Sequence, residues 1–155
     1  MIDEISLNIL KILQDKARIP NVEVARQVGM APSAVLERIR KLENQGFIDG
    51  YEVRLNPQRF RRTLVAFVHI GVDCVDDDQR VAMQLAQMDE VQEVHFVAGA
   101  DGYLIKVRVA GPAELDLLVR KRIRSLTGIR STRSQIVTAT MKETARIPID
   151  DLDLQ

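Results

Sequence analysis

The sequence predicts an α+β protein with a helical N-terminal domain and a second domain of strands and helices. Apolar residues recur at helical spacing in the first 46 residues, and they change to the alternation typical of strands beyond residue 63. Charge divides at the same place. Residues 1–62 carry eleven Lys and Arg against eight Asp and Glu, whereas the remainder carries eleven against fourteen. We therefore expect domains at 1–55 and 63–155, joined by a linker at 56–62.

Three helices are expected in the first 46 residues. The first carries apolar residues at helical spacing, namely Ile5, Ile9, Ile12 and Leu13. The second spans 22–28 behind an N-cap at Asn21, and Gly29 can take the left-handed conformation that ends it. The third begins at Pro32, a residue type favoured at the first helical position. Its inward side is apolar, with Val35, Ile39 and Leu42.

The spacing of Ala25, Gly29 and Val35 indicates a helix-turn-helix. Such a motif needs a small residue where its helices cross, a glycine in the turn, and an apolar residue on the second helix that faces the first. Residues 47–55 alternate in polarity and predict a short strand pair, or wing, behind it. A plain three-helix unit with a solvated charged face is the alternative. The ordered spacing and the wing favour a protein that binds double-stranded DNA.

Six residues of the third helix are candidate DNA contacts. A recognition helix reads bases with its N-terminal residues and contacts phosphates further along. Three residues are therefore expected near base edges, namely Ser33, Ala34 and Glu37. Three more are expected to contact phosphates or guanines, namely Arg38, Arg40 and Lys41.

The residue pattern of the second domain predicts the element order βαββαβ, a ferredoxin-like arrangement. Strands are expected at 64–74, 91–98, 103–110 and 129–141, and helices at 113–125 and after Asp76–Asp78. The helix after Asp76–Asp78 is expected to carry Val81, Met83, Leu85 and Met88. The turn at 99–102 joins the two middle strands as a hairpin.

The first strand of this domain is apolar on both faces. One face carries Leu64, Ala66, Val68, Ile70 and Val72, and the other carries Val65 and Phe67. Two helices cover only one face of a four-stranded sheet, so the second face needs a partner. A second copy of the chain is the simplest partner, which predicts a homodimer. His69 and His95 are expected on this second face.

Several functions are disfavoured by composition. The chain has one cysteine, Cys74, and two histidines without metal-ligand spacing, so we expect neither a metal site nor a cofactor. No nucleophile–base pair, phosphate-binding glycine loop or carboxylate pair indicates an enzyme. No apolar run is long enough to span a bilayer, and Asp3 and Glu4 stand where a leader peptide would carry positive charge. We expect a cytoplasmic protein.

Over nearly its full length the chain resembles the leucine-responsive regulator/AsnC (feast-or-famine) family of transcription factors. The matching stretches are Leu7–Gln14, Ala17–Ile19, Val28–Val35, Arg38–Ile48, Gly50–Tyr51, Asn56–Pro57, Gly99 and Tyr103–Val107. The resemblance implies a winged helix-turn-helix followed by an amino-acid-sensing βαββαβ domain. It also implies dimers that often assemble into octamers, with an amino-acid effector bound between subunits near the turn at 99–102.

The resemblance makes Gly99, Asp101, Gly102 and Tyr103 the expected effector-binding residues. Thr138 and Thr140 alternate on the last expected strand, where they either line the same pocket or are ordinary strand residues. Two positions depart from the family pattern. Ala31 replaces the usual hydroxyl N-cap of the recognition helix, a loss of about 1 kcal/mol. Asp101 stands one position early, with Gly102 directly before the aromatic residue. If that acid contacts the amino group of the effector or shapes the turn, the pocket is altered, and an atypical effector or none at all is then an open alternative.

Two alternative functions remain open at this stage. The altered turn is compatible with an architectural DNA-binding protein that has no effector. Sirohaem decarboxylases resemble the same family and share its two-domain plan, but they need histidines and basic residues gathered in one pocket. The presence of only two histidines counts against an enzyme of this kind.

Overall fold

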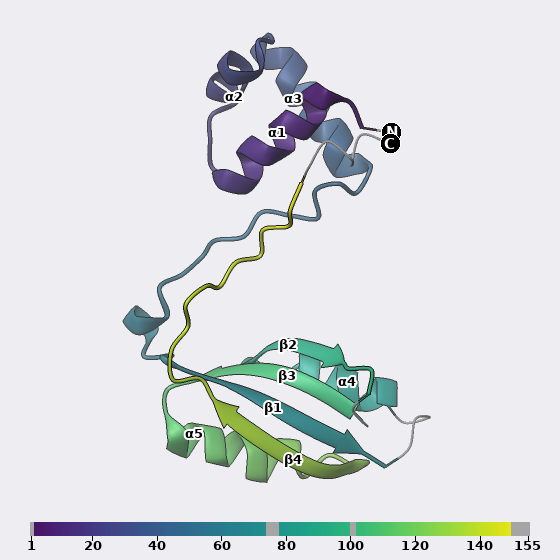
Figure 1. The fold of residues 1–155 in the computed structure, drawn as a ribbon, viewed down its shortest axis with the longest axis vertical. Helices are drawn as coiled ribbons and strands as arrows, with labels where there is room; N and C mark the ends of the chain where they lie inside the picture. Colours follow the sequence, from purple (N-terminus) through teal and green to yellow (C-terminus); the bar gives the residue numbers. More distant parts are fainter. Residues whose placement is uncertain (1, 74–77, 100–101, 150–155) are drawn as a thin grey trace. The chain divides into compact units, whose positions relative to one another are not determined.

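The computed structural model describes residues 2–73, 78–99 and 102–149. The chain divides into two compact units, one formed by Met1–Arg54 with Glu143–Gln155 and the other by Leu55–Lys142 (Figure 1). The C-terminal segment therefore groups with the helical unit, whereas the sequence placed it with the second domain. The reason is a set of contacts between residues 146–149 and the first helix, which are described below.

The first unit contains the three expected helices, α1 (Glu4–Asp15), α2 (Asn21–Val28) and α3 (Pro32–Asn44). Their inward faces form one apolar cluster with Ile2, Leu7, Ile9, Leu13, Val24, Ala25, Val35, Ile39 and Leu42 buried. Val24 and Val35 are fully buried where α2 meets α3. The spacing of apolar residues therefore predicted both the helices and their inward faces.

The helix ends agree with the sequence at two positions and differ at a third. Gly29 ends α2 in the left-handed conformation, with φ of +69°. Ala31 precedes α3 without a side-chain cap, as expected. Asn21 is the first residue of α2 rather than its N-cap, because Pro20 occupies that position and offers no side-chain hydrogen bond.

The strand pair expected at 47–55 is absent from the structure of this chain. No backbone hydrogen bond among the described residues joins two parts of this segment. Val53 and Leu55 are instead largely exposed. The hydroxyl of Tyr51 donates to the Glu43 carboxylate of α3 over 2.9 Å. Burial and this bond raise the pKa of Tyr51 to about 12. Alternation of polar and apolar residues alone did not predict this segment correctly, because a strand also needs a second strand that bonds to its backbone.

The second unit has the expected order βαββαβ and begins with a short 3-10 turn, η1 (Pro57–Phe60). Its further elements are β1 (Leu64–Val72), α4 (Asp78–Ala86), β2 (Val91–Phe96), β3 (Gly102–Val109), α5 (Pro112–Leu117), η3 (Leu118–Ile123) and β4 (Ile129–Ile136). The four strands form one sheet in the order β2-β3-β1-β4, and all neighbours are antiparallel. This is the strand order of a ferredoxin-like fold.

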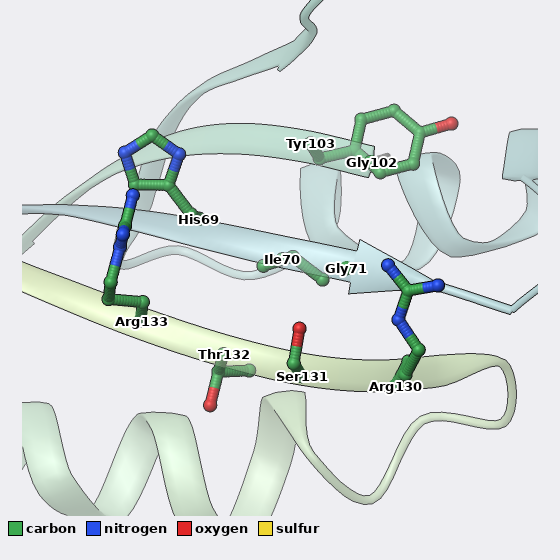
Figure 2. Close-up of a pocket in the computed structure, with 9 residues that line it drawn as sticks. All are labelled: His69, Ile70, Gly71, Gly102, Tyr103, Arg130, Ser131, Thr132 and Arg133. Atoms are coloured by element: carbon green, nitrogen blue, oxygen red, sulfur yellow. The ribbon is translucent and has the colours of Figure 1, made fainter. Parts of the chain in front are cut away.

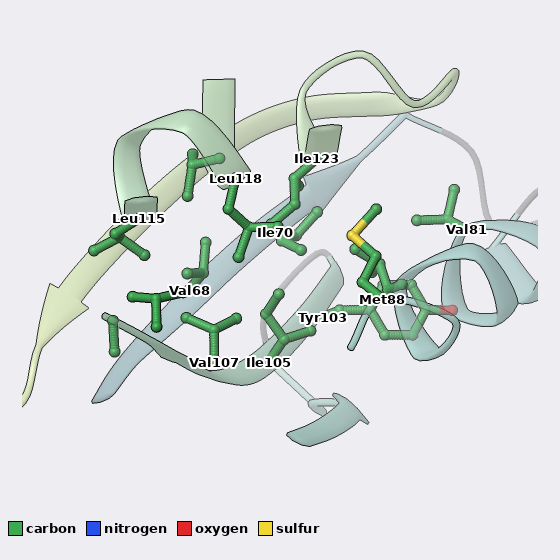
Figure 3. Close-up of a cluster of buried hydrophobic side chains, with 14 of the residues drawn as sticks. Val68, Ile70, Val81, Met88, Tyr103, Ile105, Val107, Leu115, Leu118 and Ile123 are labelled. Atoms are coloured by element: carbon green, nitrogen blue, oxygen red, sulfur yellow. The ribbon is translucent and has the colours of Figure 1, made fainter. Parts of the chain in front are cut away.

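The two helical segments pack on one face of this sheet (Figure 3). Ala66, Val68 and Ile70 of β1 are buried there, as the alternation predicted. They meet residues from both helical segments, namely Val81, Leu85, Leu115, Leu118 and Ile123. Met83, which was expected on the same helix, is 61% exposed. It lies two positions from Val81, which places it on the other side of α4.

The second helical segment changes its hydrogen bonding midway. α5 continues directly into η3, which is a π-helix. The amide of Arg124 donates to the carbonyl of Val119, five residues earlier, over 2.9 Å. The wider turn brings Leu118, Val119 and Ile123 to the core together. None of the helices in the described part of the chain is both long and apolar enough to cross a membrane.

Candidate nucleic-acid interface and effector site

The outer side of α3 is open to solvent. Val35, Ile39 and Leu42 face the core of the first unit. Of the six candidate DNA contacts, four are exposed, namely Ser33, Glu37, Arg40 and Lys41, and two are half-buried, namely Ala34 and Arg38. Arg40 donates to Glu37 over 3.1 Å, and both side chains are more than half exposed. An exposed pair of this kind contributes little to stability, so it yields readily to a phosphate.

Arg38 differs from the other cations of α3 because it contacts α1. Its guanidinium donates to Asp3 over 2.5 Å and to the hydroxyl of Ser6 over 2.9 Å. Asp3 is also the N-cap of α1 and accepts the amide of Ser6 over 2.8 Å. The hydrogen bonds from Ser6 and Arg38 hold the pKa of Asp3 well below its usual range. Arg38 thus joins α3 to α1, a role that the sequence did not suggest.

In the described part of the second unit, both helical segments pack on one face of the sheet and no helix covers the other. His69 of β1 lies beside Leu104 of β3 and Arg133 of β4, and His95 of β2 follows Leu104 in the same row. Because paired residues share a face, both histidines lie on the open face, as expected. Val65 of this face is buried within the chain, with 8% exposed.

The open face is more polar than β1 alone suggested. On the same face, Glu93 of β2 pairs with Lys106 of β3. The Glu93 carboxylate accepts a hydrogen bond from Lys106 over 3.1 Å and lies 3.3 Å from the ring of His95. Burial opposes ionisation of Glu93, but the bonds from Lys106 and His95 outweigh it and lower the pKa of this carboxyl. His69 contacts Gln135 over 3.2 Å. Apolar and polar side chains therefore alternate on this face.

A hollow of about 290 Å³ lies at the end of the sheet where β3 begins (Figure 2). Its lining residues come from β1, β3 and β4, namely His69, Ile70, Gly71, Gly102, Tyr103, Arg130, Ser131, Thr132 and Arg133. Gly71 and Gly102 are paired across β1 and β3. In Figure 2, Arg130, Ser131, His69 and Arg133 rise on the same side of the sheet, whereas Thr132 points to the other side.

The expected effector residues lie partly at this hollow. Gly102 and Tyr103 line it, and Gly99 lies in the turn that precedes β3. The ring of Tyr103 packs edge-on against Phe96, with centroids 5.4 Å apart. Asp101 lies outside the described residues, as do Cys74, Asp76 and Asp77.

Thr138 and Thr140 are not at this hollow within one chain, and the expected strand to residue 141 was too long. β4 ends at Ile136, which pairs with Ala66 at the opposite end of β1 from Gly71. Beyond it, the amide of Val137 is the one described backbone group that bonds to β1, donating to the carbonyl of Val65 over 2.9 Å. Thr138 and Thr140 are exposed. β-branched residues made the strand look longer than its pairing allows.

Sequence reasoning missed the residues of the hollow on β1 and β4. Gly71 was the available signal, since a glycine inside a strand often marks a bulge or a close approach of backbone. The register shift between Gly71 and Val72 against β4 is such an irregularity. Arg130, Ser131 and Arg133 become neighbours of Gly102 only through strand pairing, which a single sequence does not show.

Comparison with known proteins agrees with this architecture. A winged helix-turn-helix DNA-binding family matches residues 2–49, and the Lrp/AsnC ligand binding domain family matches residues 65–147. The leucine-responsive regulatory protein of Escherichia coli is 38% identical over 152 residues, which cover 96% of this chain and 92% of that protein.

Two solved structures share the fold over almost the whole chain. A Neisseria meningitidis transcriptional regulator in complex with L-Met has a TM-score of 0.93 at 25% identity, covering 98% of this chain and 99% of the other. AsnC of E. coli has a TM-score of 0.87 at 26% identity, covering 96% and 99%. With both domains matched in order, this chain belongs to the Lrp/AsnC family of transcriptional regulators, DNA-binding proteins with a ligand-binding domain rather than enzymes.

Proposed function

We propose that α3 is the recognition helix and lies in the major groove of the operator. Ser33, Ala34 and Glu37 then stand near base edges, and Arg40 and Lys41 contact phosphates or guanines. The observation that carries this proposal is the outer side of α3, whose polar residues are exposed while its apolar residues are buried. Arg38 joins these contacts only when it releases Asp3 and Ser6.

The open face of the sheet supports a homodimer. Phe67 and Leu104 are only partly covered within one chain, and no helix packs over them in the described residues. A second sheet placed on this face would bury them and would bring two recognition helices into one particle. We propose that such dimers assemble further, to octamers or another higher oligomer, and act in the cytoplasm, where the DNA is.

We further propose that an amino acid bound at the hollow between subunits modulates DNA binding. The hollow contains Gly102 and Tyr103, two of the expected effector residues, and it opens on the face proposed for dimerisation. A ligand that favours one arrangement of the oligomer changes the affinity for DNA by its differential binding to the arrangements.

A salt titration of binding to the chain's own promoter, with and without each amino acid, tests this function. The logarithm of the affinity should fall linearly with the logarithm of salt concentration. Lys41→Gln should weaken binding and make the slope shallower by about 0.9, which is the contribution of one phosphate contact. Lys142→Gln is the matched control, because Lys142 is an exposed cation far from α3 in sequence.

Two results would contradict the proposal. An affinity independent of salt would remove the phosphate contacts from α3. An unchanged slope for Lys41→Gln would remove Lys41 from the interface. Calorimetry with the amino acids separates the regulator from an architectural DNA-binding protein, because the latter would show no heat and no change in assembly.

A further inference from the structure

One stretch of the second domain is strongly basic. Residues 117–142 carry seven Lys and Arg and no Asp or Glu, whereas the rest of 63–155 carries four Lys and Arg against fourteen Asp and Glu. Four of the seven cations lie within five positions at the end of the second helical segment. We call these four the basic ridge, namely Arg120, Lys121, Arg122 and Arg124. Cations gathered on one helix of an otherwise acidic domain indicate a surface that binds a polyanion.

The π-helix η3 turns the basic ridge towards solvent. Leu118, Val119 and Ile123 are buried against the sheet, and Figure 3 shows Leu118 and Ile123 in this core. The three residues between Val119 and Ile123 are all exposed. In an α-helix, Arg122 would share a face with the buried Leu118, four positions earlier. The bonds of η3 span five residues and widen each turn, so Arg122 lies outside with the other ridge cations.

Half of the ridge cations have a carboxylate partner. Arg120 forms an ion pair with Asp116 over 2.7 Å, and Arg122 forms one with Glu90 over 2.5 Å. Among the described residues, no carboxylate pairs with the other two ridge cations, and both are exposed. Both side chains of the pair between Arg120 and Asp116 are more than half exposed, and such a pair contributes little to stability. The ridge therefore has cations available for an anionic partner.

The two ridge cations without a carboxylate partner, Lys121 and Arg124, have a spacing that suits duplex DNA. Residues three positions apart on a helix are neighbours, with Cβ atoms about 5–6 Å apart. Each strand of a duplex carries one phosphate per about 3.4 Å of its axis, so two long side chains at this spacing can reach neighbouring phosphates. The family of this chain binds DNA through the first domain, so a duplex is a polyanion present in the same particle.

We propose that the basic ridge is a second DNA-binding surface, which contacts phosphates independently of sequence. Lys121 and Arg124 contact phosphates directly, and Arg120 joins them when it exchanges Asp116 for a phosphate. Phosphate contacts carry no sequence information, so the ridge adds affinity and leaves the choice of operator to α3. This inference rests on the proposed function, in which α3 is the recognition helix, and it extends DNA binding to the ligand-binding domain.

A salt series with the full chain tests the ridge on two duplexes of equal length, the promoter fragment and a scrambled sequence. Lys121→Gln/Arg124→Gln should weaken binding to both by about tenfold or more, since two charged contacts are lost. The slope of log affinity against log salt should become shallower by about 1.8 on both, about 0.9 for each phosphate. The ratio of the two affinities should stay the same. A merely structural role of these residues would not change the slope.

Two variants serve as controls. Lys121→Arg/Arg124→Lys keeps both charges and should bind like wild type. Lys142→Gln removes an exposed cation outside the ridge and should leave both slopes unchanged. Circular dichroism melts show whether each variant is folded, and sedimentation velocity shows whether it assembles like wild type.

Three results would overturn the inference. They are an unchanged slope in Lys121→Gln/Arg124→Gln, a loss of affinity confined to the promoter duplex, and a smaller assembly of this variant, which would make the ridge a contact between chains. The failure of the proposed function looks different. Wild type that binds the promoter no better than the scrambled duplex would contradict the role of α3, whereas the slopes of the ridge variants would still decide whether the ridge binds DNA.

Discussion

At the start of α1, Asp3 holds two groups at once, the amide of Ser6 and the guanidinium of Arg38. Removing a side-chain N-cap costs about 1 kcal/mol, and Asn caps as well as Asp. Asp3→Ala should therefore lower the free energy of unfolding at neutral pH by about 1 kcal/mol. Asp3→Asn should cost less, because it keeps the cap and loses only the ion pair with Arg38. Urea denaturation followed by circular dichroism measures both.

The same carboxyl predicts a dependence on pH. The pKa of Asp3 is lowered in the folded chain, so its stabilisation is complete above the unfolded value of about 3.9. The stabilisation is lost as the pH falls below that value towards the folded pKa. Wild type and Asp3→Ala should therefore approach each other in acid. A stability difference that is the same at pH 7 and pH 2.5 would refute the role of the charge.

Gly102 is the second residue for which we predict a loss of stability on substitution. Its φ is +157°, and a Cβ would stand 1.9 Å from the Ile70 carbonyl oxygen, which belongs to a central strand and cannot move alone. Gly102→Ala should lower the melting temperature of the second unit, with a loss of about 1–3 kcal/mol. Gly111→Ala is the control, because nothing lies within 4 Å of its Cβ position and its φ is extended. Equal melting of the two variants would show that β1 and β3 are less closely apposed than the structure indicates.

At the scale of elements, the C-terminal segment is held at the end of α1. Gln14 donates to the carbonyl of Ile147 over 2.8 Å and accepts its amide over 3.0 Å. Arg146 forms an ion pair with Asp15 and donates to the carbonyl of Gln14 over 3.3 Å. A cation at the carbonyl end of a helix satisfies groups that the helix leaves unpaired. Ile149 adds an apolar contact with the core of the first unit.

Gln14→Ala should release this segment. The two exposed bonds together contribute about 1 kcal/mol, so the Ile147 amide should exchange its hydrogen roughly fivefold faster. Hydrogen exchange read by mass spectrometry or NMR measures this rate. Gln27→Ala is the matched control, because among the described residues the Gln27 side chain bonds to Glu23 alone, within α2. Equal exchange in both variants would mean that Gln14 does not hold the segment.

The elements that the sequence predicted well are those whose signal is local. Pro32 marked the first residue of α3, and Gly29 marked the end of α2, because each constrains its own backbone. The strand expected at 47–55 and the extension of β4 to residue 141 were wrong for the opposite reason. A strand exists only where a partner supplies hydrogen bonds, and no local pattern reports the partner.

The candidate sites follow the same division. The outer residues of α3 were predictable, because helical spacing alone separates Lys41 from Leu42. The hollow was not, because Gly71, Gly102 and Ser131 are distant in sequence and meet only through the pairing of three strands. Arg38 shows a further limit, since its role depends on Asp3, which is 35 residues away in the chain.

At the scale of the whole molecule, the homodimer that we propose through the open sheet face would link association of two chains to DNA binding. Leu104 lies in the middle of this face, between His69 and His95 in one cross-strand row. Leu104→Arg would place a cation between His69 and His95, in the row that ends at Arg133, and, in a face-to-face dimer, against the same face of the partner. Like charges brought together in an interface oppose association. We therefore expect the dimer dissociation constant to rise by at least about tenfold.

Sedimentation equilibrium measures this constant, and Leu117→Arg is the matched control. Leu117 is 56% exposed on α5, on the helical side of the same domain, so the same substitution there should leave the dimer intact. Promoter affinity should fall when dimerisation is lost, because two linked recognition helices bind far more tightly than one at the same concentration. A Leu104→Arg chain that remains dimeric would show that the two copies associate through another surface. The same result would move the shared effector site away from the hollow over Gly71 and Gly102.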